Sequence, residues 1–197
     1  MSMPTYKVCC DKCDFQAWSY KLWGAKEYVD LKGEEIPLDA TFSWCNKCQS
    51  IEPIESFDNT ATYVSKLHQS LAAIKADTNS IIKLFFTRLM SSVRVTDKYF
   101  LNEAQVYARK IEQDIKRKGT EKCLTCGSNN VELYAGDKSI GWHLVPEVDG
   151  ENAFINIQHP NCGGEFYISS KLNRIGMALE RRMFSLDGIE IKNIENE

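Results

Sequence analysis

Residues 10–13 read CDKC, and residues 45–48 read CNKC after an interval of 31 residues. A second set follows the same plan, with CLTC at 123–126 and, after 32 residues, HPNC at 159–162. A spacer of two residues lets both side chains of a pair converge on one ion from a tight turn, and two such turns complete a tetrahedron of soft ligands. The sequence therefore predicts two structural metal sites, around which the chain folds.

We expect each site to hold one Zn²⁺. The predicted ligands are Cys10, Cys13, Cys45 and Cys48 for the first ion, and Cys123, Cys126, His159 and Cys162 for the second. Iron also accepts four thiolates, so ligand type leaves iron open at the first site. Cys9 is an alternative to Cys10, and His143 is an alternative to His159. Exchange of pairs, so that a pair from each end of the chain shares one ion, also stays open.

The composition is that of an ordinary soluble protein, with 197 residues of which 43% are hydrophobic. The first residues, MSMPTYKVCC, lack a basic segment followed by an apolar run, and no stretch reaches the roughly 18 apolar residues of a membrane span. We therefore expect a cytoplasmic protein that does not bind membranes. Reducing compartments favour metal ligation over disulfides, and seven of the eight cysteines fall into the ligand pattern.

Charge is unevenly distributed within the formal net charge of −3. Residues 57–120 carry 11 basic and 6 acidic groups, whereas both flanking segments are acidic. The expected organisation is an N-terminal zinc ribbon (1–56), a helical unit (57–120), a C-terminal zinc ribbon (121–168), and a C-terminal helix and tail (169–197). This is an α+β fold in which two zinc ribbons flank about three helices.

The helical unit is predicted from residues 54–118, which contain neither proline nor glycine. Two segments rich in N-cap residues divide this stretch into helices near 60–76, 80–94 and 97–118. The middle helix, IIKLFFTRLMSSV, is apolar around most of its circumference, which favours a place in the core of the unit or in an oligomer contact.

Apolar residues at three- and four-residue steps predict which helix faces are buried. The stripe of the first helix is Ala61, Val64, Leu67, Leu71 and Ile74, and that of the third is Phe100, Ala104, Tyr107, Ile111 and Ile115. A similar pattern near the C-terminus, Leu172, Ile175, Leu179 and Met183, predicts the C-terminal helix.

Both ligand sets resemble zinc ribbons, the β-hairpin metal modules found in transcription factors, polymerase subunits, primases and many bacterial proteins. The resemblance covers about residues 8–56 and 121–168. It implies strands that carry metal-bearing turns at one end, and it is specific for metal binding while implying no activity.

A second resemblance, to HNH nucleases that carry a zinc knuckle, has catalytic consequences. Its motif residues are Cys123, Cys126, Gly127, His143, Pro146, Gly150, Asn156, Ile157, Gln158 and Cys162. The resemblance implies that His143 is the general base and that Asn156 orients it. However, Trp142 stands where the family usually places a metal-binding aspartate, His159 follows Asn156 too soon, and Gly163 occupies the last metal-ligand position. A nuclease-derived but inactive fold therefore fits better than an active enzyme.

The sequence thus predicts a non-catalytic, structural zinc protein that acts as an adaptor for protein partners. A nucleic-acid-binding accessory factor is the first alternative, and a degenerate HNH-type nuclease is the second. Nucleic acid would bind through basic residues within 83–118, namely Lys83, Arg88, Arg94, Lys98, Arg109, Lys110, Lys116, Arg117 and Lys118. A solvated helix surface is the simpler interpretation of these charges.

Overall fold

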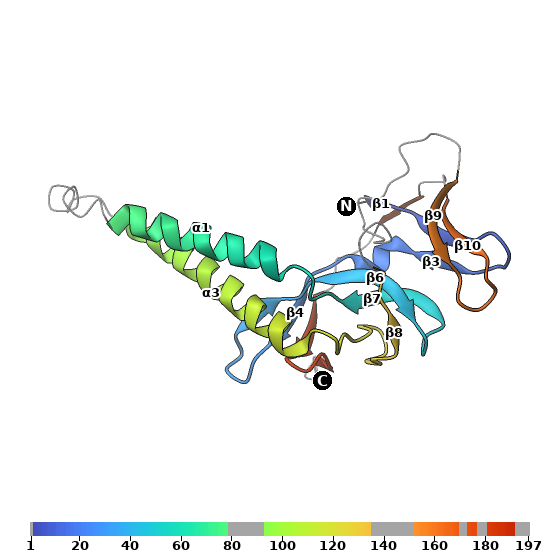
Figure 1. Ribbon diagram of the computed structural model, residues 1–197. Helices are drawn as coiled ribbons and strands as arrows, with labels where there is room; N and C mark the ends of the chain where they lie inside the picture. Colours follow the sequence, from blue (N-terminus) through green and yellow to red (C-terminus); the bar gives the residue numbers. More distant parts are fainter. Residues whose placement is uncertain (1, 79–92, 135–151, 170–172, 177–180, 192–197) are drawn as a thin grey trace, which may run out of the picture. The chain divides into compact units, whose positions relative to one another are not determined.

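The computed structural model describes residues 2–78, 93–134, 152–169, 173–176 and 181–191 (Figure 1). The chain divides into two compact units. The first unit, which we call the β-unit, combines Met1–Ser56 with Thr120–Glu197, and the second, the helical hairpin, is Phe57–Gly119. No helix among the described residues is long and apolar enough to cross a membrane.

The β-unit contains strands from both ends of the chain and one short 3-10 helix, η1. Its N-terminal elements are β1 (Ser2–Thr5), β2 (Lys7–Cys10), β3 (Gln16–Trp18), η1 (Ser19–Leu22), β4 (Lys26–Val29), β5 (Glu35–Pro37), β6 (Ala40–Cys45) and β7 (Ser50–Glu55). Its C-terminal elements are β8 (Val131–Glu132), β9 (Ala153–Gln158), β10 (Glu165–Ile168), β11 (Asn173–Gly176), β12 (Arg182–Ser185) and β13 (Glu190–Ile191).

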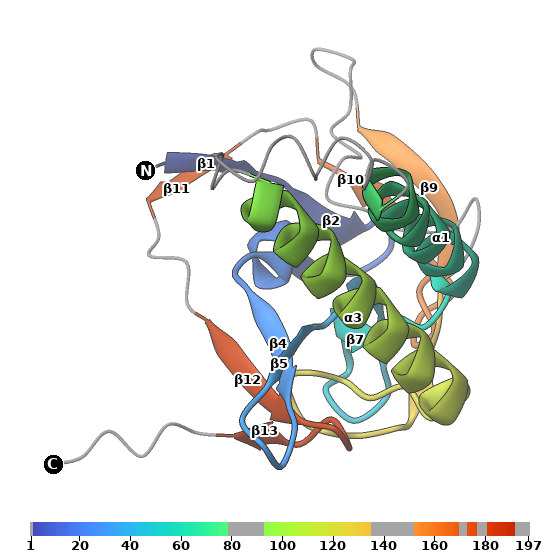
Figure 2. The same ribbon diagram turned by 90° about the vertical axis from the view of Figure 1, so that its left-hand side faces the viewer.

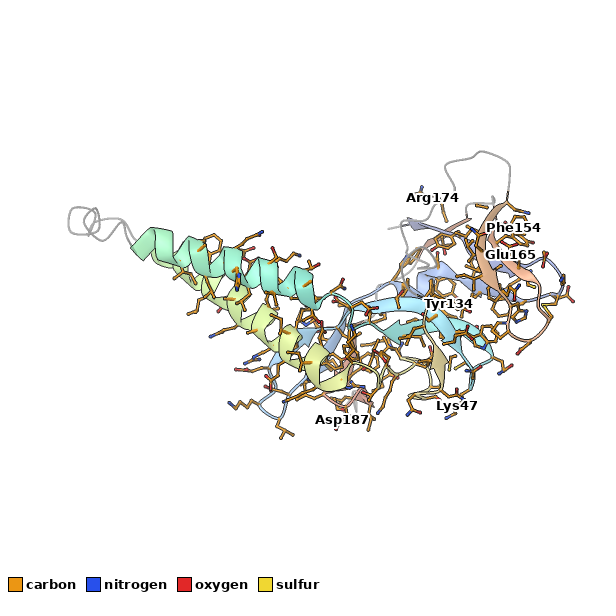
Figure 3. All side chains as sticks on the ribbon, viewed as in Figure 1. Lys47, Tyr134, Phe154, Glu165, Arg174 and Asp187 are labelled. Carbon is orange, nitrogen blue, oxygen red and sulfur yellow. The ribbon has the colours of Figure 1, made fainter. Side chains whose placement is uncertain are left out.

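Every sheet in the described part of this unit pairs N-terminal strands with C-terminal ones. The sheet orders are β1-β11, β3-β2-β10-β9, β13-β12-β4-β5 and β7-β6-β8. Most pairs are antiparallel, but β12 runs parallel to β4, with Arg182 opposite Lys26. Figure 2 shows β12 beside β4, and Figure 3 labels Phe154 on β9 and Glu165 at the start of β10. The two ends of the chain therefore form one folded unit.

The main core of the β-unit lies between the β3-β2-β10-β9 sheet and the β7-β6-β8 sheet. It gathers buried side chains from both sheets and from the residues next to their strands: Tyr6, Val8, Cys10, Ala17, Phe42, Trp44, Ile51, Tyr134, Ile157, Phe166 and Ile168. Alternation along β10 illustrates how strands supply this core, because Phe166 and Ile168 are buried while Tyr167, between them, is only partly so. Burial of these aromatic and β-branched residues is the main stabilising contribution expected for this unit.

The helical hairpin consists of α1 (Thr60–Thr78) and α3 (Val93–Arg117), which lie side by side in Figures 1 and 2. The rings of Tyr63 and Tyr107 stack between them with centroids 6.2 Å apart. Polar contacts also join the same helices. Thr60 donates to Asp114 (2.8 Å), Ser70 donates to a Glu103 carboxylate (3.3 Å), and Lys110 donates to the Tyr63 hydroxyl (3.2 Å).

The buried faces of these helices differ from the predicted stripes. On α1, Tyr63 and Ser70 are buried, whereas Val64 and Leu71 are 38% and 48% exposed. On α3, Ala104 is buried as expected, but Ile115 is 72% exposed. The contacts between the helices include a tyrosine stack and hydrogen bonds, while several of the apolar side chains on both helices are exposed.

The predicted fold class is wrong. We expected about three helices between two separate zinc ribbons, followed by a C-terminal helix. The described residues instead contain two α-helices and are mostly β-sheet. The segment expected to form the C-terminal helix, Leu172 to Met183, instead contains β11 and the start of β12, because each finds a strand partner. Tertiary pairing thus overrides the helical spacing of the apolar residues. The predicted middle helix falls almost entirely on residues 79–92, outside the described residues.

Candidate metal centres

The first candidate metal centre, which we call the histidine cluster, gathers Cys10, Cys13, His159 and Cys162. The Sγ atoms of Cys10 and Cys162 are 3.4 Å apart, and those of Cys162 and Cys13 are 3.7 Å apart. His159 Nδ1 lies 3.0 Å from Cys162 Sγ and 3.3 Å from Cys13 Sγ. Four soft donor atoms therefore converge on one point.

The second candidate metal centre, the all-cysteine cluster, gathers Cys45, Cys48, Cys123 and Cys126. Its Sγ atoms are 3.6 Å apart between Cys45 and Cys126 and 3.9 Å apart between Cys48 and Cys123. Cys45 and Cys123 are fully buried, whereas Cys13 and Cys162 of the histidine cluster are exposed. The two clusters thus share a ligand plan and differ in access to solvent.

These distances fit one tetrahedral ion per cluster. A Zn–S bond of about 2.3 Å places the sulfur atoms of a tetrahedron about 3.8 Å apart, and a Zn–N bond of about 2.0 Å places nitrogen about 3.5 Å from each sulfur. In each cluster, all donor atoms lie within 4.8 Å of one another. The residues present can therefore hold two metal ions, one in each cluster.

The clusters contain all eight predicted ligands, but they combine the pairs differently from the sets we expected. Cys10 and Cys13 meet the pair at 159–162, and Cys45 and Cys48 meet the pair at 123–126. This is the exchanged arrangement that the sequence left open. Each cluster joins one turn from the N-terminal part of the chain to one from the C-terminal part.

Strand pairing explains the exchange at the histidine cluster. The pair at 10–13 lies in the turn between β2 and β3, and the pair at 159–162 lies in the turn between β9 and β10. Because β2 and β10 are neighbours, with Cys10 opposite Phe166, the two turns meet at one edge of the sheet. Asp11 strengthens this meeting, since its carboxylate accepts a hydrogen bond from the Glu165 amide (2.7 Å).

At the all-cysteine cluster, β7 guides the C-terminal pair into place. The β6–β7 turn carries Cys45 and Cys48, and the segment before β8 runs along β7, with Cys123 opposite Ile54. The Leu124 amide donates to the Pro53 carbonyl at 2.9 Å. These backbone contacts bring the two cysteine pairs together.

Two buried carboxylates on β7 also hold this segment. Glu55 accepts hydrogen bonds from the Lys122 amide (2.9 Å) and the Tyr28 hydroxyl (2.7 Å). Glu52 accepts one from the Thr125 hydroxyl (2.9 Å), inside the Cys123–Cys126 turn. Buried carboxylates need such partners. Sequence reasoning missed both residues, because charged side chains on a strand usually indicate its solvent-facing side.

His159 is 4% exposed and presents Nδ1 to the thiols. Its ring lies 5.0 Å from the rings of Phe15 and Phe166 and 5.1 Å from that of Trp44, measured between centroids. Its Nε2 atom is buried among these rings without a hydrogen-bond partner among the described residues. Burial lowers the pKa of His159, which favours the neutral imidazole that metals bind.

Proximity of the thiols affects their ionisation. Burial, assisted by Cys45, raises the pKa of Cys123 to about 12. The Phe15 amide lowers the pKa of Cys13, but partial desolvation and the thiols of Cys10 and Cys162 outweigh it and raise the value to about 11. These raised pKa values mean that the thiolate form is disfavoured in the absence of metal. A bound divalent cation reverses this, because coordinating thiols are deprotonated outright.

The remaining sequence candidates lie outside both clusters or outside the described residues. Cys9 is buried but belongs to neither cluster, because alternation along β2 directs it away from Cys10; it lies opposite Tyr167 of β10. His143, the alternative ligand and proposed nuclease base, lies outside the described residues. Asn156, its proposed partner, is exposed on β9 with a φ of 54°. His68 is exposed on α1.

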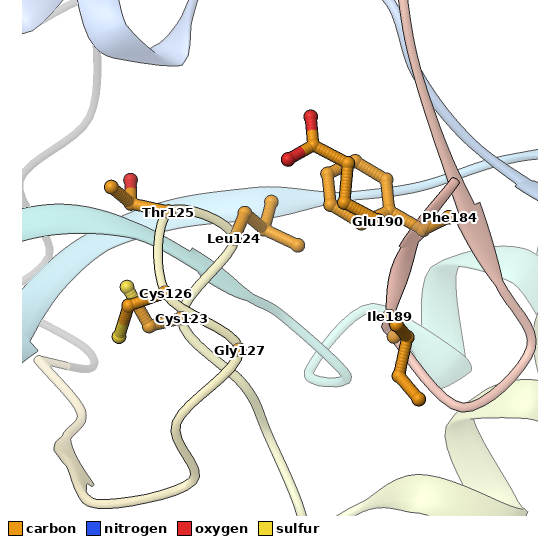
Figure 4. Close-up of a pocket in the computed structure, with 9 residues that line it drawn as sticks. Cys123, Leu124, Thr125, Cys126, Gly127, Phe184, Ile189 and Glu190 are labelled. Carbon is orange, nitrogen blue, oxygen red and sulfur yellow. The ribbon is translucent and has the colours of Figure 1, made fainter. Parts of the chain in front are cut away.

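A cavity of about 240 Å³ adjoins the Cys123–Cys126 turn (Figure 4). The buried side chains of Leu124 and Phe184 line it together with the exposed Ile189. In this view, the Cys123 and Cys126 thiols lie on the other side of the loop from Phe184 and Ile189. The apolar residues Phe184 and Ile189 thus line the cavity on the side of the turn that faces away from the thiols.

Comparisons of the chain with models of protein families, with curated proteins and with solved structures gave no match.

Proposed function

We propose that this chain is a structural zinc-binding protein that serves as a non-catalytic adaptor for protein partners. The observation that carries the proposal is the closure of both clusters, each of which has four protein donors within 4.8 Å of one another. A zinc ion held by four protein ligands has no position left for substrate or activated water, whereas catalytic sites keep one open. The metals would then stabilise the fold instead of acting on a substrate.

Zinc is the proposed metal because the donor sets are thiolates and one imidazole with tetrahedral spacing. A structural zinc ion can also join ligands that lie far apart in the sequence. Each ion would join segments more than 70 residues apart in the sequence, as between Cys48 and Cys123. Zinc-finger peptides gain an apparent 10–16 kcal/mol from such binding at neutral pH.

An apolar stripe on the helical hairpin supports the protein-partner part of the proposal. Leu101, Ala108 and Ile115 recur at seven-residue steps on α3 and are all exposed. Residues at this spacing share one face of a helix. Large exposed apolar side chains in such a row are typical of surfaces that contact proteins.

The basic residues of the hairpin give less support to nucleic-acid binding, because four of them are engaged within the hairpin. Lys110 donates to the Tyr63 hydroxyl (3.2 Å), Lys116 pairs with Glu112 (2.6 Å), and Lys118 pairs with Asp58 (3.4 Å). Arg117 is buried, with its guanidinium over the Phe57 ring. Lys83 and Arg88 lie outside the described residues.

Photo-crosslinking in the native cell tests the adaptor proposal. A photoreactive amino acid is placed at Ala108 on the stripe and, as a control, at Asn102, which helical geometry places about 120° away around α3. The proposal predicts protein crosslinks from position 108 that exceed those from 102 and that Ile115→Glu abolishes. Equal labelling from both positions, or crosslinks to nucleic acid alone, would overturn it. Elemental analysis of the same protein should find two zinc ions per chain.

A further inference from the structure

The two metal clusters are joined by a hydrogen bond between their turns. Asn161 precedes Cys162 of the histidine cluster, and Gln49 follows Cys48 of the all-cysteine cluster. The Asn161 Nδ2 atom donates to Gln49 Oε1 at 2.7 Å. A change in the position of either turn must therefore move or break this bond.

Gln49 is held at both ends of its side-chain amide. Its Nε2 atom donates to the Asn46 carbonyl within its own turn at 2.6 Å, while its Oε1 atom accepts from Asn161. Its backbone φ of 52° lies in the left-handed region, which few residues other than glycine adopt without support. The turn that positions Cys45 and Cys48 thus also positions the acceptor for the other cluster.

A second connection runs through Trp44, which precedes Cys45 and is fully buried. Its ring meets that of His159 edge-on, with centroids 5.1 Å apart and planes at 67°. Its Nε1 atom donates to Asn46 Oδ1 at 3.1 Å, inside the turn of the all-cysteine cluster. The indole therefore contacts a ligand of one cluster and the ligand-bearing turn of the other.

We propose that the two metal sites bind their ions cooperatively, so that metal in either cluster raises the affinity of the other. The inference rests on the proposed function, namely that both clusters bind zinc. A metal that orders one turn fixes Gln49, Asn161 and Trp44, and the second metal then meets a turn that is already ordered. Linkage requires the effect to be equal in both directions, and typical couplings change affinity by about 5- to 150-fold.

Native mass spectrometry of the full chain titrated with Zn²⁺ tests this coupling, because it counts chains with no zinc, one zinc and two zinc ions. The wild-type protein should show little of the one-zinc form at half saturation. Asn161→Ala keeps all eight ligands and removes the bond between the turns. The squared one-zinc population divided by the product of the zero-zinc and two-zinc populations gives a ratio that rises as the coupling weakens. Asn161→Ala should raise this ratio by about three- to tenfold, the change expected for the loss of one hydrogen bond. Gln105→Ala, an exposed amide on α3, is the control and should leave this ratio unchanged.

Two further variants test reciprocity. Cys13→Ser disables the histidine cluster and should weaken zinc binding at the all-cysteine cluster, and Cys126→Ser should weaken the histidine cluster by the same factor. Circular dichroism of each zinc-loaded variant checks that it is folded. An unchanged population ratio in Asn161→Ala would overturn the coupling while leaving two zinc sites intact. If the wild-type chain takes up fewer than two zinc ions, the proposed function itself fails.

Discussion

The indole of Trp44 lies edge-on to the imidazole of His159, with ring centroids 5.1 Å apart. Trp44 is fully buried, and the next residue, Cys45, belongs to the other cluster. One aromatic side chain therefore serves as core of the β-unit, as part of the wall around a metal ligand, and as the anchor of a neighbouring metal-binding turn.

Truncation of this side chain should affect both stability and metal binding. Trp44→Ala is expected to lower the free energy of unfolding by about 3–5 kcal/mol, as for other buried aromatic residues. It should also speed zinc loss from the histidine cluster, because the His159 ring loses a wall. Chemical denaturation of the zinc-loaded protein measures the first effect. Trp44→Phe keeps an aromatic ring and is the control. If both variants lower the free energy of unfolding equally, aromatic packing against His159 is unimportant.

Gly164 should be essential to the histidine cluster for a steric reason. A Cβ atom at this position would lie 2.5 Å from Cys10 Sγ and 2.6 Å from Asp11 Oδ1. Gly164→Ala is therefore expected to reduce zinc content from two ions per chain to one, measured by elemental analysis after dialysis. Gly176→Ala is the matched control, since a Cβ there meets no atom within 4 Å. Retention of two tightly held ions in Gly164→Ala would show that the turn geometry is wrong.

Thiol reactivity should distinguish the two clusters. Cys13 and Cys162 are exposed, whereas Cys45 and Cys123 are fully buried. Under limiting N-ethylmaleimide, we expect the zinc-loaded protein to be modified first at Cys13 and Cys162, and the histidine cluster to lose zinc first. Peptide mapping by mass spectrometry measures the order. Earlier modification of Cys45 or Cys123 would contradict the burial that the structure assigns to them.

Lys26 provides a test by pH that is independent of the metal ligands. Its ammonium donates to the carbonyls of Leu22 (2.7 Å) and Trp23 (3.0 Å), and burial together with Arg182 lowers its pKa from 10.5 to about 8. Between these values the unfolded chain holds the proton that the folded chain has lost. Stability contributed by Lys26 should therefore rise with pH across this window, by at most about 3 kcal/mol.

Denaturation curves of wild-type protein and Lys26→Met between pH 7.5 and pH 10 measure this effect by difference, since other ionisations are common to both proteins. The wild-type protein should gain stability relative to the variant above about pH 8, the pKa of Lys26 in the folded chain. If the difference in stability between the two proteins stays constant across this pH range, Lys26 titrates as an ordinary exposed lysine.

The sequence was sufficient to find the residues that converge in the clusters, because a two-residue spacer is a local constraint on a turn. It could not determine which turns meet. That depends on the pairing of β2 with β10 and of β6 with β8, which join residues more than 80 positions apart, such as Cys10 with Phe166. Similar intervals within each half of the sequence favoured two separate ribbons, but local spacing carries no information about such long-range pairing.

The C-terminal segment shows the same limit. Apolar spacing around Met183 predicted a helix, but Arg182 to Ser185 form β12 because β4 offers a parallel partner. Long-range pairing also explains why the supporting residues were missed. Gln49 and Asn161 are unremarkable polar residues in sequence, and only the fold brings them within 2.7 Å of each other.

Cadmium-113 NMR of the protein loaded with two Cd²⁺ ions tests the central claim most directly, because scalar couplings from each ion to cysteine β-protons identify its ligands. We predict one resonance coupled to Cys45, Cys48, Cys123 and Cys126, and a second coupled to Cys10, Cys13 and Cys162, with His159 as its nitrogen ligand. If one of the two resonances is instead coupled to Cys10, Cys13, Cys45 and Cys48 together, the exchanged pairing is contradicted and two separate ribbons are restored.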